Sequence, residues 1–306
     1  MPLVILLFAM FASIFTFQKN ALNFSEPFFL VGSRMLCAGI VLVLFLSIRE
    51  HKIWQKIELK HLKDLILLGV CNIYLTNILE IWGAKTMISS KVCLLYSLSP
   101  FIAALLAAVI LKEKQSWKKF LGMSIGFIGL LPIIFTQTPN EELSGKLFIF
   151  TRAELAVICA VVTSVYGWII LKKLISEYQY SPLFANGLSM ILGGVLALLQ
   201  SFFAGEQWHP LPINNYTQFL LSAGAMLIIS NLICYNLYGF LLKRYTATFM
   251  SFAGLITPIF AVLYGWLFLH EPVTFYFFVS LLLFAVGLVI FYREEIKLGK
   301  VFKNNQ

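Results

Sequence analysis

Ten apolar runs constrain what this chain can fold into more than any other feature of its sequence, because a helix of roughly 20 apolar residues crosses a bilayer core of ~30 Å. The composition agrees. Hydrophobic residues make up 60% of the chain and charged residues only 12%, whereas about a quarter of a soluble domain is charged. We predict an all-α integral membrane protein with ten transmembrane helices, at residues 3–22, 27–48, 62–84, 87–111, 117–136, 153–174, 182–204, 216–240, 246–269 and 273–292.

The two halves of the chain repeat one another at a constant offset of 158 residues. Pro100 is followed by Glu113, and Pro258 by Glu271, with thirteen residues from proline to glutamate in both cases. A glycine follows each glutamate sixteen residues later. Such self-similarity at a fixed period indicates an internal repeat.

The basic residues give an orientation. If the amino terminus is cytoplasmic, seventeen of the 23 lysines and arginines fall in inner loops and the carboxyl-terminal tail. The outer side of the membrane then holds five, Lys19, Lys85, Lys91, Lys146 and Arg152. Because cytoplasmic loops are enriched in Lys and Arg, we expect both termini in the cytoplasm. The net charge of +9 therefore belongs to the loops and does not call for a nucleic-acid partner.

Five spans per half is an odd number, so the second half enters the membrane inverted relative to the first. We therefore expect two inverted five-helix repeats, at residues 1–136 and 153–292, with an outer loop at 137–152 and a basic cytoplasmic tail at 293–306. Inverted repeats are common in secondary transporters, whose substrate site lies near the middle of the membrane between the repeats. A duplicated membrane scaffold that transports nothing is the alternative of another class.

The fourth span ends with Ser99-Pro100 to Glu113, and the ninth ends with Thr257-Pro258 to Glu271. With ten spans in two halves, this pattern resembles the drug/metabolite transporter superfamily of the EamA type. The resemblance covers nearly the whole chain. It implies a small-molecule substrate moved by alternating access across a bacterial inner membrane.

A finer resemblance lies at the start of the second span. Ser25-Glu26-Pro27-Phe28-Phe29, followed by Gly32-Ser33-Arg34, is similar to S-adenosylmethionine transporters of bacteria that live inside eukaryotic cells. That branch implies uptake of S-adenosylmethionine in exchange for S-adenosylhomocysteine. Export of amino acids or related metabolites is the alternative within transport.

Polar side chains inside spans three and eight are the first candidates for substrate binding, because each is costly in lipid unless it faces protein or a cavity. The offset of 158 relates Asn77 and Glu80 to Tyr235 and Tyr238. With Asn231, the two tyrosines follow helical spacing on one face. An acidic wall opposite an aromatic wall suits a cationic ligand with a flat ring. The alternatives are that Asn231 only bonds neighbouring helices and that the tyrosines belong to the interfacial aromatic belt.

Arg34 lies about seven residues into span two, where an unpaired charge is expensive. It pairs with a carboxylate such as Glu80, anchors an anionic substrate group, or extends outward to the membrane surface. Further polar or aromatic candidates for the binding site are Tyr96, Ser99, Tyr166, Trp168 and Thr257.

Pro100 and Pro258 break helical hydrogen bonding at matched depths. We expect them to act as hinges, with incidental kinks as the alternative. Span five carries Gly122, Gly126 and Gly129, small residues that allow helices to approach closely. We expect this stripe to pack within its own repeat, and a homodimer through it is the alternative.

The sequence contains no Ser-His-Asp set, phosphate-binding loop, zinc-ligand spacing or paired intramembrane carboxylates. It therefore predicts no enzyme activity, no cofactor and no metal site. The loops are too short to contain a nucleotidase, which argues against an ATP-driven pump. The expected partners are a small-molecule substrate and the lipid bilayer.

Overall fold

The computed structural model describes residues 2–49, 58–110, 117–134, 141, 145–147, 149–208, 211–245 and 247–297. Within them, ten helical segments are long and apolar enough to cross a membrane, which confirms the predicted spans. Their ends fall close to the predicted ones. The segments are Pro2–Ala21, Pro27–Arg49, Leu59–Ala84, Ser89–Leu106, Trp117–Ile134, Arg152–Ser176, Pro182–Phe203, Tyr216–Leu241, Phe249–Leu269 and Phe275–Arg293.

Several spans consist of more than one helix. In chain order the elements of the first half are α1 (Pro2–Ala21), α2 (Pro27–Arg49), α3 (Leu59–Leu68), η2 (Gly69–Leu75), α4 (Thr76–Ala84), α5 (Ser89–Tyr96), α6 (Ser99–Ile110), α7 (Trp117–Ile128) and α8 (Leu131–Ile134). The second half contains α10 (Arg152–Ser176), α11 (Pro182–Phe203), α12 (Tyr216–Met226), η3 (Leu227–Cys234), α13 (Tyr235–Leu241), α14 (Ala247–Ala253), η4 (Gly254–Ile256), α15 (Thr257–Leu269) and α16 (Phe275–Lys297). Between the halves, β1 (Lys146–Leu147) and β2 (Phe150–Thr151) form a short antiparallel hairpin.

The breaks within spans occur at matching places in the two halves. Spans three and eight each contain a π-helical turn, η2 and η3, whose first residues are 158 positions apart. Spans four and nine are interrupted immediately before Ser99 and Thr257. The breaks in spans four and nine lie next to Pro100 and Pro258, where we expected helical hydrogen bonding to be interrupted, whereas the π-helical turns were not predicted. The matching breaks are consistent with the predicted repeat.

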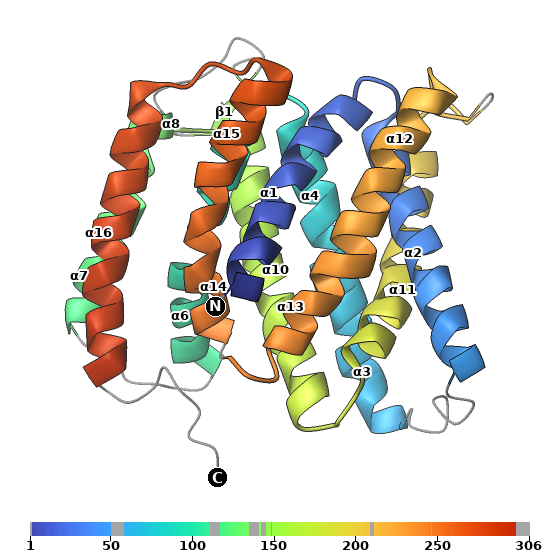
Figure 1. Ribbon diagram of the computed structural model, residues 1–306, viewed down its shortest axis with the longest axis horizontal. Coiled ribbons are helices and arrows are strands. Elements are labelled where there is room, and N and C mark those ends of the chain that lie inside the picture. Colours follow the sequence, from blue (N-terminus) through green and yellow to red (C-terminus); the bar gives the residue numbers. More distant parts are fainter. Residues whose placement is uncertain are drawn as a thin grey trace.

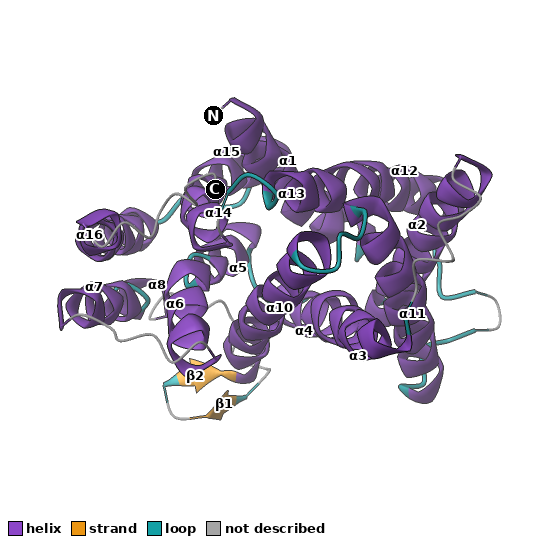
Figure 2. Ribbon diagram, turned by 90° about the horizontal axis from the view of Figure 1, so that it is seen from below, coloured by secondary structure: helices purple, strands orange, loops and turns teal. Residues whose placement is uncertain are grey.

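Figure 1 shows the spans running side by side between two faces, with α7 and α16 at one end of the molecule and α2 and α11 at the other. Seen along the spans in Figure 2, α1, α4, α10 and α13 lie in the middle. The carboxyl ends of α2, α10 and α13 and the amino end of α3 share the lower face of Figure 1. Four of the predicted cytoplasmic charges, Arg49, Lys60, Lys173 and Arg244, lie at or beside these ends.

Glycines bring helices of opposite halves together at both ends of the molecule. A Cβ atom on Gly122 of α7 would lie 2.6 Å from the carbonyl oxygen of Gly287 in α16. At the other end, a Cβ atom on Gly39 of α2 would lie 2.8 Å from the carbonyl oxygen of Gly187 in α11. We expected the stripe in span five to pack within its own repeat. Gly126 packs against Phe101 of its own repeat and also against Gly287 of α16, and Gly122 and Gly129 both meet residues of α16.

Lys91 corrects the charge count that we used for orientation. We counted it as a charge on the outer side of the membrane, but it lies in the first turn of α5 and is fully buried. Its Nζ atom lies 2.6 Å from Glu141 Oε2 and 2.7 Å from Glu154 Oε1. Two carboxylates compensate the cost of burying the ammonium group. Lys91 therefore belongs to the protein interior and carries no information about loop charge.

The carboxylate of Glu271 joins the loop after α15 to the start of α5. It accepts hydrogen bonds from the backbone N–H of Ser89 at 3.0 Å and from the Ser89 hydroxyl at 3.0 Å. His270 adopts a left-handed conformation that ends α15 and turns the chain toward α5. The counterpart of Glu271 in the predicted repeat is Glu113, which lies outside the described residues.

Candidate functional site

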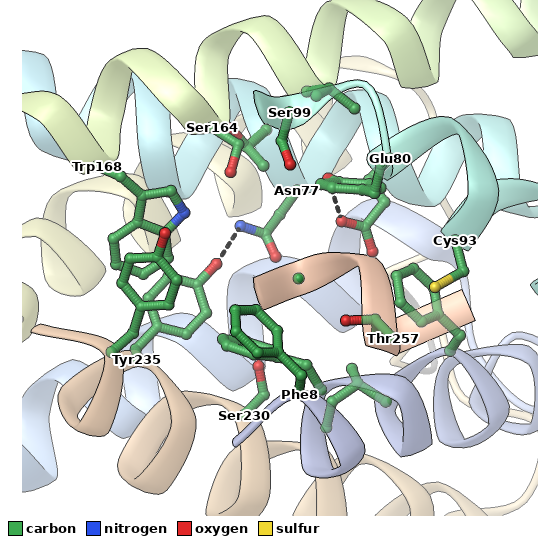
Figure 3. Close-up of a pocket in the computed structure, with 18 of the residues that line it drawn as sticks. Phe8, Asn77, Glu80, Cys93, Ser99, Ser164, Trp168, Ser230, Tyr235 and Thr257 are labelled. Atoms are coloured by element: carbon green, nitrogen blue, oxygen red, sulfur yellow. Dashed lines mark hydrogen bonds between the residues drawn. The ribbon is translucent and has the colours of Figure 1, made fainter. Parts of the chain in front are cut away.

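A cavity between the two halves is lined by residues of α1, α2, α4, α5, α10, η3, α13 and α14 and by the first residues of α6 and α15. It encloses about 940 Å³ between the side chains, including its opening. Figure 3 shows Trp168 and Tyr235 on one side of the cavity, Glu80 on the other and Asn77 between them.

Asn77 is positioned by the π-helical turn that precedes it. Such a turn leaves backbone carbonyls without their usual partners. The side-chain amide of Asn77 donates to the carbonyl oxygens of Ile73 at 2.9 Å and Asn72 at 3.4 Å. Its nitrogen also lies 3.3 Å from the hydroxyl of Tyr235, which accepts. These contacts use only the nitrogen of the amide, so its oxygen can accept a hydrogen bond from α2.

Arg34 of α2 donates a hydrogen bond to the amide oxygen of Asn77. Its Nη2 atom donates to Asn77 Oδ1 at 3.0 Å, and its side chain is only 4% exposed. The alternative in which Arg34 extends to the membrane surface is therefore wrong. Within the described part of the chain no ion pair joins it to Glu80. Its Nε atom is buried without a hydrogen-bond partner, so part of the guanidinium has unused donor capacity beside the cavity.

Glu80 lies one turn beyond Asn77 on α4 and lines the cavity. The hydroxyl of Tyr96 donates to its Oε2 atom at 2.6 Å, a short bond of the kind a carboxylate forms. Arg34, Asn77, Glu80 and Tyr96 together form what we call the polar wall of the cavity. It contains one positive and one negative side chain, each bonded to a neutral neighbour.

Five rings from α1, α10 and α13 form what we call the aromatic wall, namely Phe8, Phe11, Trp168, Tyr235 and Tyr238. The ring centroids of Trp168 and Tyr238 are 4.1 Å apart and those of Trp168 and Tyr235 5.3 Å. Phe11 meets both tyrosines edge-on. Tyr235 and Tyr238 are 7% and 5% exposed, which excludes the interfacial belt. Such a wall attracts flat rings and cations.

Ser99 and Thr257 line the cavity at the points where spans four and nine are interrupted. Each is the first residue of a new helix, so its position depends on the break. The prolines that follow, Pro100 and Pro258, occupy the first helical turn, where the missing N–H of proline costs nothing. They explain where the helices restart, and a hinge role stays a prediction.

Sequence reasoning missed the contribution of α1 and three hydroxyls. Phe8, Phe11 and Gln18 line the cavity, as do Thr76, Ser230 and Ser251. Nothing in the apolar first span distinguishes a ring that faces a cavity from one that faces lipid. Only the packing of α1 against spans eight and nine reveals it.

The family model of the EamA-like transporter family matches residues 1–135 and 151–293. This chain belongs to the EamA-like transporter family. It is 38% identical over 96% of its length to the S-adenosylmethionine/S-adenosylhomocysteine transporter of Chlamydia muridarum, of which 91% is covered. It is 37% identical over 95% of its length to the protein of that name from Chlamydia trachomatis serovar L2, of which 88% is covered. One crystal structure matches 97% of this chain and 96% of its own with a TM-score of 0.67 at 14% identity, which shows the fold alone.

In this EamA-like transporter, two predicted site residues lie away from the cavity. Asn231 is fully buried and its amide nitrogen lies 2.8 Å from the sulfur of Met35, so its alternative role of bonding a neighbouring helix is the one observed. We placed it on the face of Tyr235 by ordinary helical spacing, but it lies inside η3, where the π turn changes that spacing. Tyr166 packs into an apolar cluster around Leu171 and Leu174.

Proposed function

We propose that this multi-pass membrane transporter takes up S-adenosylmethionine in exchange for S-adenosylhomocysteine. The observation that carries the proposal is near-full-length similarity to chlamydial proteins of that name, at 38% and 37% identity. Both cargo molecules carry adenine, a flat ring system, and an α-amino acid group with two opposite charges.

The cavity supports this cargo chemically. The aromatic wall provides ring faces for adenine and for the sulfonium charge of S-adenosylmethionine. The polar wall provides hydrogen-bonding groups and charges of both signs. The cavity lies between the two halves, which is the position expected for the substrate site of a transporter built from two repeats.

Alternating access requires parts that move against each other, and two inverted repeats supply them. The interruptions before Ser99 and Thr257 divide spans four and nine next to the cavity, and we propose them as hinges. The contacts of Glu271 with Ser89 join the two halves at the upper face of Figure 1. Lys19 acts beside them, because its Nζ atom donates to the carbonyl oxygens of Ala84 and Met87 at 2.9 and 2.6 Å. We propose that these contacts close the outer side.

We place the protein in a bacterial inner membrane with both termini in the cytoplasm. Support comes from the basic residues at the helix ends of one face, because such residues are retained on the cytoplasmic side.

The test uses the purified full-length protein in liposomes loaded with S-adenosylhomocysteine. Labelled S-adenosylmethionine added outside should accumulate, and unlabelled S-adenosylhomocysteine added afterwards should release it. Liposomes without protein and liposomes without internal S-adenosylhomocysteine are the controls. No accumulation combined with efflux of preloaded amino acids would favour an amino-acid exporter. No movement of either cargo would favour the scaffold.

A further inference from the structure

We infer that the polar wall is a binding subsite for the α-amino acid group of the cargo, in which Arg34 binds the carboxylate and Glu80 binds the ammonium group. The inference rests on the proposed function, because it assumes a cargo with this group. It assigns the two parts of the cargo to the two walls, with adenine on the aromatic wall.

Among the described residues, the two charges of the polar wall form no direct ion pair with each other. Arg34 donates to the neutral amide of Asn77, and Glu80 accepts from the neutral hydroxyl of Tyr96. A buried charge without an opposite charge is costly in a membrane protein. The pair therefore suits a ligand that brings both an anionic and a cationic group.

The Arg34 side chain also contains a donor that the protein leaves unused. Its Nε atom is buried and has no hydrogen-bond partner, although the side chain lines the cavity and is 96% buried. Buried polar groups are nearly always bonded, and an exception calls for an explanation such as an absent ligand. Guanidinium groups bind carboxylates through two parallel N–H donors. A ligand carboxylate would supply the missing acceptor.

The spacing fits a small zwitterionic group. Asn77 and Glu80 lie three residues apart in α4, so their side chains are neighbours on one helix face. Because Asn77 holds the guanidinium of Arg34, the positive group is fixed about one helical turn from the carboxylate of Glu80. The ammonium and carboxylate of an α-amino acid share one carbon atom and can span such a gap.

This arrangement explains how one site can accept both exchange partners. S-adenosylmethionine and S-adenosylhomocysteine share adenine and the amino acid group and differ only in the sulfonium charge. In our assignment that charge meets only ring faces, which limits the preference for S-adenosylmethionine to about 30-fold. An exchanger needs two partners that compete at comparable concentrations.

A ligand series on the wild-type protein tests the assignment without any substitution. In the liposome assay, unlabelled compounds compete with labelled S-adenosylmethionine. Decarboxylated S-adenosylmethionine lacks only the carboxylate, and methylthioadenosine lacks the whole amino acid group. We expect both to compete about 30-fold or more weakly than S-adenosylhomocysteine, because each leaves a buried charge unpaired. Equal competition by methylthioadenosine overturns the inference and leaves the proposed function intact. Absence of any S-adenosylmethionine uptake overturns both.

Two substitutions separate the roles of the charges. Glu80→Gln should weaken S-adenosylmethionine and S-adenosylhomocysteine by the same factor, within about threefold, because both carry the ammonium group. A loss confined to S-adenosylmethionine would mean that Glu80 meets the sulfonium, which contradicts the inference. Arg34→Gln should remove the difference between S-adenosylmethionine and its decarboxylated form. If that difference persists, the carboxylate binds elsewhere.

The matched control is Glu206→Gln. Glu206 accepts hydrogen bonds from the backbone N–H groups of Phe28 and Phe29 at 2.8 Å, outside the cavity. This substitution removes a carboxylate with bonds to the protein, as Glu80→Gln does. It should leave the affinity for each of the two cargo molecules unchanged, whereas Glu80→Gln lowers both. A loss of affinity as large as that of Glu80→Gln would show that the assay responds to general damage and would remove the support from Glu80→Gln.

Discussion

Spans three and eight contribute opposite walls of the cavity, and in both spans an asparagine side chain bonds backbone carbonyls that a π-helical turn leaves free. Asn77 donates to Asn72 and Ile73, and Asn236 donates to Asn231 and Leu232. These two patterns are 159 residues apart, one more than the offset of the sequence repeat.

The difference lies in what the asparagine oxygen does. In span three, Asn77 Oδ1 accepts from the charged Arg34 beside the cavity. In span eight, Asn236 Oδ1 accepts from the neutral amide of Asn186 on α11, away from the cavity lining. An asparagine that bonds the carbonyls of a π-helical turn thus positions the charge of Arg34 in span three, whereas in span eight it only joins two helices. A symmetric backbone can therefore carry an asymmetric site.

Replacing each asparagine tests this comparison and should give the largest effect. Asn77→Leu and Asn236→Leu both leave carbonyls unsatisfied, which costs about 1–3 kcal/mol of stability. Asn77→Leu also leaves the guanidinium of Arg34 unpaired, so we expect a further loss of about 3 kcal/mol and no measurable exchange. Thermal unfolding in detergent and liposome exchange measure the two quantities. Equal loss of exchange in both variants would remove the functional distinction between the spans.

The aromatic wall should show the next largest effect. Trp168→Ala removes a ring stacked on Tyr238 and should weaken both cargo molecules by about 1–3 kcal/mol, the value for a base stacked on an aromatic side chain. Competition assays measure the affinities. Tyr166→Ala is the matched control, since this ring packs outside the cavity, and it should lower stability without changing affinity. Reversed outcomes for the two variants would place adenine elsewhere.

Tyr235→Phe should produce the smallest effect. It keeps the ring and removes only the hydroxyl, which accepts from Asn77 at 3.3 Å. The loss of one neutral hydrogen bond within the protein costs about 0.5–1.5 kcal/mol of stability, and because the ring is kept, competition assays should show affinities for both cargo molecules within about twofold of wild type. A larger loss for S-adenosylmethionine alone would show that the hydroxyl, and not the ring, meets the sulfonium.

The number of spans and most candidate residues could be predicted from sequence because lipid imposes simple rules. Apolar length marks a span, and a polar residue within it needs a partner. Asn77, Glu80, Tyr235 and Tyr238 were found in this way, and the structure places all four at one cavity.

The predictions failed where they assumed regular α-helical spacing or considered only residues close in the sequence. Helical spacing failed for Asn231 because a π turn lies across it, and nothing in the residue types announces that turn. Lys91 was counted among the charges of the outer side because its partners, Glu141 and Glu154, are far along the chain. The rings of α1 were missed because their neighbours come from spans eight and nine. Contacts between distant segments are the information that a single sequence lacks.

The packing of α7 against α16 has a consequence for how the protein is made. The ribosome completes the glycine face of α7 long before it produces α16, the last helix. Until then that face lacks the helix against which it packs. The first half alone therefore cannot reach its final packing, and assembly finishes only when the last span enters the membrane. Two halves expressed as separate chains should find each other through these glycines.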